Sequence, residues 1–187
     1  LLMVFLITWS QPAKKISFFV FVAISFLVGM IAEMIGVHTG LLFGNYTYGS
    51  IMGLQVANVP LIIGLNWFVV LYSALAALHF FIDHFTKKNN LSKGSSANSP
   101  ISIMLIFGSA LLAVIFDWVM EPVAVKLGFW TWAGNGQIPW LNYLSWFFIC
   151  ILLLSIFRIL KIKPDNIFAV NLFLIQLMFF LFLRIFL

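Results

Sequence analysis

Charged residues are scarce in this chain. Of its 187 residues, only 8% are Asp, Glu, Lys or Arg, and 64% are hydrophobic. Soluble domains carry about 25% charged residues, so the composition excludes a soluble protein. A membrane-spanning helix needs about 20 apolar residues, which leaves room for about six such helices. We therefore predict an all-α, polytopic membrane bundle that forms a single integral membrane domain over residues 1–187.

Cysteine and histidine are scarce too. The single Cys150 lies in an apolar run, which excludes a disulfide framework and a thiolate metal cluster. Three His residues are too few for a di-iron hydroxylase or desaturase with many histidine ligands. His79, Asp83 and His84 could ligate a metal through an i,i+4 pair. A polar helix end explains them better, so we predict no metal site.

The apolar runs predict the spans and their order. They lie at residues 1–9, 16–36, 59–83, 101–121, 139–160 and 165–187. The chain opens without Met in apolar sequence, so we expect the first span to be the end of a truncated helix. Pro122 is expected to kink or end the fourth span. The uncharged loop 37–58 is expected to fold back against the membrane surface or into the bundle.

Basic residues fall on alternate loops. Most of them lie in the loops 10–16, 86–100 and 157–165. The positive-inside rule predicts that these loops are cytoplasmic and that the aromatic loops face outward. The same rule explains the net charge of +5, so we predict no nucleic-acid partner.

Two segments, 33–67 and 117–146, share the same series of residues: an acid, an aromatic–Thr–aromatic triplet, a proline and a tryptophan. In both, the acid precedes the triplet by thirteen positions and the proline precedes the tryptophan by seven. The matched residues are Glu33, Tyr46-Thr47-Tyr48, Pro60 and Trp67 in the first segment and Asp117, Trp130-Thr131-Trp132, Pro139 and Trp146 in the second. This pattern predicts a parallel helix–loop–helix repeat, over about 17–85 and 101–161, with a pseudo-two-fold axis along the membrane normal. Chance similarity between aromatic-rich membrane segments is the alternative.

Three acids lie within or at the ends of predicted spans. An acid in a span costs about 2.5–3.5 kcal/mol on insertion scales, so it normally faces a cavity or a partner and marks function. Asp117 and Glu121 are spaced i,i+4 and share one helix face, so one can hold a proton while the other acts as a base. The repeat predicts that Glu33 and Asp117 converge on one site. A structure with Glu33 and Asp117 on opposite outer faces would contradict a two-carboxylate mechanism. The alternative is a purely structural role, above all for Glu33 and Glu121.

The aromatic triplets have two interpretations. Trp and Tyr at a loop are typical of the interfacial belt of a membrane protein. They could instead line a pocket that grips a polyene or stabilises a cation, and the matched spacing favours this second interpretation. His38 could join a proton relay, although a lone loop His is usually not catalytic. The candidate substrate-binding residues are His38, Tyr46, Tyr48, Asn66, Trp67, Trp130, Trp132, Asn142 and Trp146.

Several ordered motifs resemble those of a known family. They are E-x-x-G-V-x-T-G-x-x-F-G-x-Y-x-Y-G, V-P-L-x-I-x-L-N-W, D-W-V-x-E-P-V-A, W-x-W and I-P-W-x-N-Y-x-x-W. Over about residues 30–150 the chain resembles the carotenoid biosynthesis membrane proteins, which include carotenoid 1,2-hydratases and bisanhydrobacterioruberin hydratases. The resemblance implies water addition to the terminal C=C of an acyclic carotenoid end, such as that of lycopene or γ-carotene, without a cofactor, in a bacterial or archaeal cytoplasmic membrane. It implies catalytic roles for Glu33, Asp117 and Glu121.

The chemistry fits the residues. Hydrating such an alkene needs a desolvated acid, surroundings that tolerate a tertiary cation, and one positioned water, which a carboxylate can activate. The sequence does not decide whether Asp117 or Glu33 is the acid. Two rival functions stay open: a non-catalytic carotenoid-binding or accessory subunit of a membrane complex, and a small transporter. The expected partners are a carotenoid and the lipid bilayer, with a homo-oligomer or other membrane subunits as further options.

Overall fold

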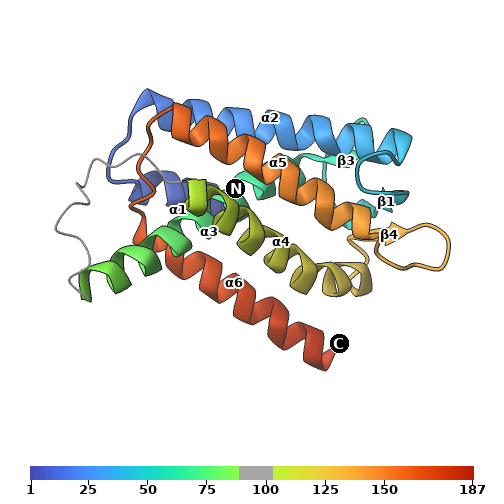
Figure 1. The fold of residues 1–187 in the computed structure, drawn as a ribbon. Coiled ribbons are helices and arrows are strands. Elements are labelled where there is room, and N and C mark those ends of the chain that lie inside the picture. The colour runs from blue at the N-terminus through green and yellow to red at the C-terminus, as the bar shows by residue number, and fades with distance from the viewer. Residues whose placement is uncertain (89–102) are drawn as a thin grey trace.

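A computed structural model describes residues 1–88 and 103–187 as a bundle of helices (Figure 1). The helices are α1 (Leu2–Ser10), α2 (Ile16–Thr39), α3 (Leu61–Lys88), α4 (Ile103–Lys126), α5 (Trp140–Ile159) and α6 (Ile167–Phe186). Five of them are long enough and apolar enough to cross a membrane, and α1, with nine residues, is too short. The predicted all-α membrane bundle is confirmed. The only additions in the described ranges are a short 3-10 turn (Ser50–Met52) and four short strands.

Three helices extend past their predicted ends, and one of them, α3, reaches Lys88 instead of residue 83. α2 runs past residue 36 to Thr39, where Gly40 adopts a φ of 67° and its N–H donates to the Gly36 carbonyl. α4 continues through Pro122 to Lys126, so the expectation that Pro122 ends the helix is wrong. In an ordinary helix the N–H of each residue donates to the carbonyl four residues earlier, and proline has no N–H to donate. The side chain of Arg184 donates to that carbonyl of Trp118 instead, at 2.8 Å.

The predicted repeat divides four of the helices into two halves. One half contains α2 and α3, and the other contains α4 and α5. α2 and α4 run toward the same end of the bundle, while α3 and α5 return from it (Figure 1). α3 packs against α2, α4 and α6, so its side chains from Trp67 to Ala77 are all buried. The repeat bounds of 17–85 and 101–161 stay a prediction.

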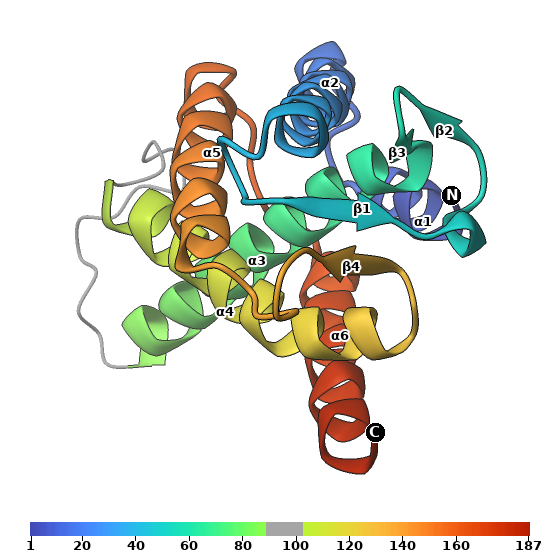
Figure 2. The same cartoon turned by 90° about the vertical axis from the view of Figure 1, so that its right-hand side faces the viewer.

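The two aromatic triplets pair with each other at this end. They form the strands β1 (Tyr46–Tyr48) and β4 (Trp130–Trp132), which lie side by side in front of the bundle (Figure 2). The pairing is antiparallel and is centred on Thr47 and Thr131, whose hydroxyl oxygens lie 3.1 Å apart. A second small hairpin joins β2 (Gln55–Val56) to β3 (Val59–Pro60). We call this end of the bundle the ribbon end.

The register of β1 and β4 is the one that a two-fold relation between the halves produces. The first residue of each triplet faces the last residue of the other. The matched tryptophans of the two halves also meet, because the rings of Trp67 and Trp146 stack at 3.9 Å with an angle of 14° between their planes. Two pairs of matched residues, Thr47 with Thr131 and Trp67 with Trp146, therefore face each other, as residues on a two-fold axis do.

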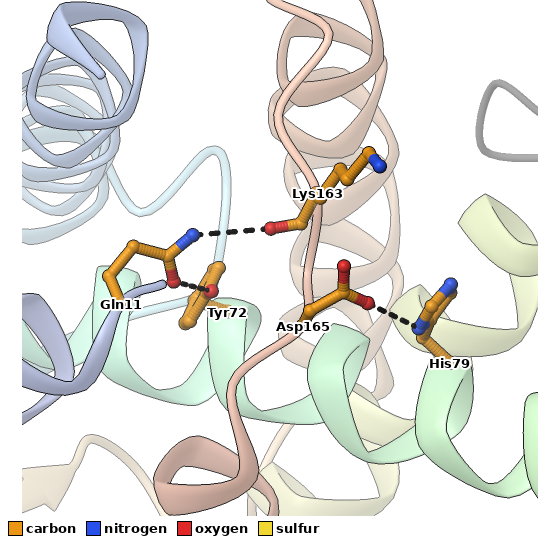
Figure 3. A network of polar contacts seen from close by, with 5 residues as sticks. All are labelled: Gln11, Tyr72, His79, Lys163 and Asp165. Atoms are coloured by element: carbon orange, nitrogen blue, oxygen red, sulfur yellow. Dashed lines mark hydrogen bonds and ion pairs between the residues drawn. The ribbon is translucent and has the colours of Figure 1, made fainter. Parts of the chain in front are cut away.

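Two of the three predicted basic loops, 10–16 and 157–165, come together at the opposite end of the bundle. The Gln11 side chain lies in the first of these loops, and its amide donates to the carbonyl of Lys163 in the second, at 3.3 Å. The Gln11 side-chain oxygen accepts from the hydroxyl of Tyr72 in α3, at 2.5 Å (Figure 3). Segments 10–16 and 157–165 therefore lie on the same side, as the charge pattern predicts. Of the third basic loop, 86–100, residues 89–100 lie outside the described residues.

The polar end of α3 contacts the segment before α6. His79 pairs with Asp165 at 3.6 Å between Nδ1 and Oδ1 (Figure 3). Within residues 1–88 and 103–187, no group of three or more His, Cys, Asp or Glu side chains is placed to hold a metal ion. His79 instead connects α3 to the segment that leads into α6.

The contact between α2 and α3 generates a test of the packing. A Cβ on Gly29 would lie 2.6 Å from ring atoms of Trp67, whereas a Cβ on Gly108 would meet only the tip of the Leu78 side chain. Overpacking a fitted interior costs about 1–3 kcal/mol. We expect Gly29→Ala to lower the midpoint of thermal unfolding in detergent, measured by tryptophan fluorescence. Gly108→Ala is the matched control and should leave the midpoint unchanged or raise it. Equal effects of the two variants would contradict this packing.

Candidate functional site

Three carboxyl groups meet beneath the ribbon. Glu33 comes from α2, Asp117 and Glu121 come from α4, and all three side chains are buried, with 1–5% of their surface exposed. They line one cavity at the ribbon end, with about 30 Å³ open to the centre of a water molecule. One water needs about 10–15 Å³ by this measure, so the cavity has room for one or two waters. The other residues that line it are Phe43, Tyr46, Tyr48, Ile63, Asn66, Trp67, Met120, Trp130, Trp132, Asn142 and Trp146.

Glu33 accepts hydrogen bonds on both of its oxygens. Its Oε2 accepts from the hydroxyls of Tyr46, at 2.5 Å, and Tyr48, at 2.7 Å. Its Oε1 accepts from the indole N–H of Trp67, at 3.0 Å. A carboxylate is an acceptor only, so three donors around one group favour its ionised form.

The two tyrosines reach Glu33 because the chain reverses after α2. The left-handed Gly40 ends the helix, and Phe43 packs against Gly36 before the strand begins. Burial and, after it, the neighbouring Glu33 raise the pKa of the Tyr46 and Tyr48 phenols above their ordinary value. Both phenols therefore stay protonated and remain hydrogen-bond donors well into alkaline pH.

Glu121 is held in the same manner by the second triplet. Its Oε2 accepts from the indole N–H groups of Trp130, at 3.0 Å, and Trp132, at 3.1 Å. Its Oε1 lies 3.4 Å from the amide nitrogen of Asn142. Glu121, and not Asp117, therefore occupies the place in the second half that Glu33 occupies in the first.

Asp117 has a different environment. Its Oδ2 accepts from the amide of Asn142, at 2.9 Å, so that one amide bridges Asp117 and Glu121. Its Oδ1 is buried and has no hydrogen-bond partner among the described residues. Of the six carboxyl oxygens in the cluster, this one alone is left without a donor. It is the oxygen on which a transferable proton could reside.

Aromatic rings form the walls of the cavity. Trp67 and Trp146 stack on each other, as described above, on one side. The ring centroid of Tyr46 lies 5.1 Å from that of Trp132, so the two strands also meet through their side chains. Faces of aromatic rings attract cations, and such rings line the cavity beside the three carboxyl groups.

The structure places all but one of the predicted site residues around this cavity. His38 lies apart from it: its side chain is exposed, and its Nδ1 lies 2.8 Å from the carbonyl of Met34. Sequence reasoning missed Phe43, Ile63 and Met120, which also line the cavity. The repeat carried a signal for Ile63, because Ile63 and Asn142 each follow their proline by three positions. Met120 lies between Asp117 and Glu121, and nothing in the sequence pattern marks it as a residue of the site.

Comparisons with known proteins identify the family of the chain. A family model described as "Carotenoid biosynthesis protein" matches residues 1–187. The chain is also 25% identical, over 117 residues, to a bisanhydrobacterioruberin hydratase from Haloarcula japonica. That match covers 61% of this chain and 36% of the relative, so the chain spans only about a third of the relative's length. No solved structure matches the chain.

The three donors around Glu33 generate a prediction. In Glu33→Gln one oxygen becomes an NH₂ group, which must then face a donor, either the Trp67 N–H or a tyrosine hydroxyl. Leaving a buried donor unpaired costs about 1–3 kcal/mol, so we expect a lower thermal midpoint in detergent. Asp165→Asn, on the exposed side chain at the opposite end, is the control and should have little effect.

A double mutant tests whether an unpaired donor next to residue 33 causes the lower thermal midpoint. Trp67→Phe removes the opposing N–H, so adding it to Glu33→Gln should cost less than the two single changes summed. Strictly additive losses would contradict the arrangement around Glu33.

Proposed function

The chain belongs to the carotenoid biosynthesis protein family, and from this premise we propose that it is a carotenoid hydratase. The reaction adds water across the terminal C=C of an acyclic carotenoid end and yields a tertiary alcohol. The proposal rests above all on Asp117 Oδ1, a buried carboxyl oxygen without a donor in an aromatic-lined cavity. The hydratase named among the relatives supports the same reaction class.

Asp117 is the proton donor in this proposal. Protonation of an alkene requires an acid whose proton is not already engaged by a neighbour, and general acids must lie within reach of the reacting atom. Glu33 accepts from three donors and Glu121 Oε2 accepts from two indoles, whereas Asp117 Oδ1 has no hydrogen-bond partner among the described residues. The alkene π pair takes the Asp117 proton and forms a C–H bond at the CH carbon. The positive charge then lies on the tertiary carbon.

Glu33 and the rings stabilise that cation. Preorganised charges act strongly in a site from which water is largely excluded. Glu33 contributes negative charge in its carboxylate form, which its three donors favour, and the aromatic rings that line the cavity contribute cation–π attraction.

Glu121 is the base. A water in the cavity attacks the tertiary carbon and forms the C–O bond, and Glu121 takes the proton that the water loses. The Asn142 amide contacts Glu121 only at 3.4 Å, so this Oε1 is the less strongly bound of its two oxygens. The proton returns from Glu121 to Asp117, its i,i+4 neighbour, through a second water. No cofactor takes part in any of these steps.

The carotenoid reaches the site from the lipid. A cavity with room for one or two waters is too small for the end of a polyene, so the end must displace side chains when it binds. Tyr48 and Asn66 are the only lining residues that are partly exposed, so we place the point of access beside them. By the positive-inside rule, the end with segments 10–16 and 157–165 is cytoplasmic and the ribbon end faces outward.

Replacing Asp117 by Asn tests the assignment of the acid. The amide cannot deliver a proton, so expression of Asp117→Asn in a lycopene-accumulating host should yield no hydrated carotenoid. The wild-type chain should yield a product heavier by one water, measured by mass spectrometry of the extracted pigment. Asp165→Asn, at the opposite end of the bundle, should match the wild type at equal expression.

The same experiment separates the rival functions. Hydrated product from Asp117→Asn would remove Asp117 as the acid. Unchanged lycopene that copurifies with the wild-type protein would contradict the hydratase and support a carotenoid-binding subunit. Unchanged lycopene without binding would leave a transporter as the better explanation.

A further inference from the structure

We infer that Arg184 is a positioning residue for the acid pair of α4, and this inference rests on the proposed function. Arg184 lies in the last turn of α6, far in sequence from the site. Its guanidinium nevertheless contacts the turn of α4 that carries Asp117 and Glu121, at the residue between them, Trp118. Its action is exerted through the helix backbone and not through contact with a substrate.

Pro122 creates the need for such a residue. It follows Glu121 directly and lies inside α4. Because proline has no N–H, the carbonyl of Trp118 loses the hydrogen bond that an ordinary helix supplies, and the proline ring crowds that carbonyl. An interrupted hydrogen bond at this point would let the turn from 117 to 121 open.

Arg184 fills this gap in two ways. Its Nη1 donates to the Trp118 carbonyl at 2.8 Å, and its guanidinium carbon lies 4.1 Å from the centroid of the Trp118 ring. The planar guanidinium can donate and stack at once, which a lysine ammonium cannot do equally well. Trp118 is half exposed, so the contact lies on the outside of the bundle, away from the cavity.

The position of Arg184 in α6 supports this role. The buried residues of α6 all lie in its first half, Ala169, Val170, Leu172 and Phe173, and the second half diverges from the other helices (Figures 1 and 2). A cation in a span is costly and normally marks function, although one near a helix end can reach toward water. Arg184 turns instead onto the backbone of α4.

The geometry of the acid pair depends on this turn. Asn142 bridges Asp117 and Glu121 only if both side chains leave α4 on the same face at their observed separation. A misplacement of about 1 Å in a catalytic group can cost about 100-fold in rate. Arg184 therefore fixes the relative position of acid and base without touching either.

A double-mutant cycle with Pro122 tests the inference. Arg184→Met should lower hydration turnover by about 10–100-fold, with little change in the carotenoid concentration needed for half-maximal rate. Pro122→Ala restores an N–H for the Trp118 carbonyl, so Arg184→Met in the Pro122→Ala background should have nearly the turnover of Pro122→Ala alone. Arg184→Lys, which keeps a donor, should retain more activity than Arg184→Met. Gln176→Met, at a half-buried position of the same helix, is the matched control and should behave as the wild type.

The same cycle measured by thermal unfolding in detergent does not depend on the reaction. The loss of midpoint caused by Arg184→Met should shrink when Pro122 is replaced by Ala. Equal losses in both backgrounds, in turnover and in midpoint, would overturn the inference. If the wild-type chain hydrates no carotenoid, the proposed function fails, and the thermal cycle alone then decides whether Arg184 supports the Pro122 turn.

Discussion

The architecture depends on the need to hydrogen-bond three carboxyl groups that lie inside an apolar bundle. A buried polar group without a partner costs several kcal/mol, and the backbone N–H groups of a helix interior are already engaged. The donors must therefore come from side chains. Five of the six are phenols and indoles, four from the paired strands and one from Trp67, and the last is the amide of Asn142. The ribbon is thus part of the site and not a passive connection.

The two halves follow one plan but differ in chemistry. Glu33 and Asp117 occupy matched sequence positions, yet the aromatic triplet of the second half bonds Glu121, which lies one turn further along α4. The first half has no second acid, because the position that matches Glu121 is Val37. Asp117 is therefore left with Asn142 alone and keeps a free oxygen. In the proposed mechanism, these different surroundings make Asp117 the proton donor, Glu121 the base and Glu33 the negative charge that stabilises the cation.

Much of this could be predicted from the sequence, because burial in a membrane leaves strong signals. Apolar runs gave the helices, and intramembrane acids with matched aromatic spacing gave all of the polar residues that line the cavity. The errors arise where a rule based on neighbouring residues misses the three-dimensional surroundings of a residue. A proline in this position favours an end of α4, but the helix continues through Pro122, and a residue 62 positions later donates to the carbonyl that the proline leaves without an N–H. His38 was included for its nearness to Glu33 in sequence, whereas α2 continues to Thr39 and leaves its side chain exposed. The pairing of acids with indoles depends on helix rotation and strand register, which spacing alone does not fix.

The position of the site suits a reaction between substances from two phases. A carotenoid is dissolved in the bilayer, whereas water arrives from the membrane surface, and the acids lie where α2 and α4 meet the ribbon. A tertiary cation has two fates, capture by water or loss of a neighbouring proton, and the second would only move the double bond. Capture is favoured when one water is already placed and held by a base. A cavity with room for one or two waters, enclosed by rings and carboxyl groups, provides this condition. The restriction on space is therefore as much a part of the proposed chemistry as the acids are.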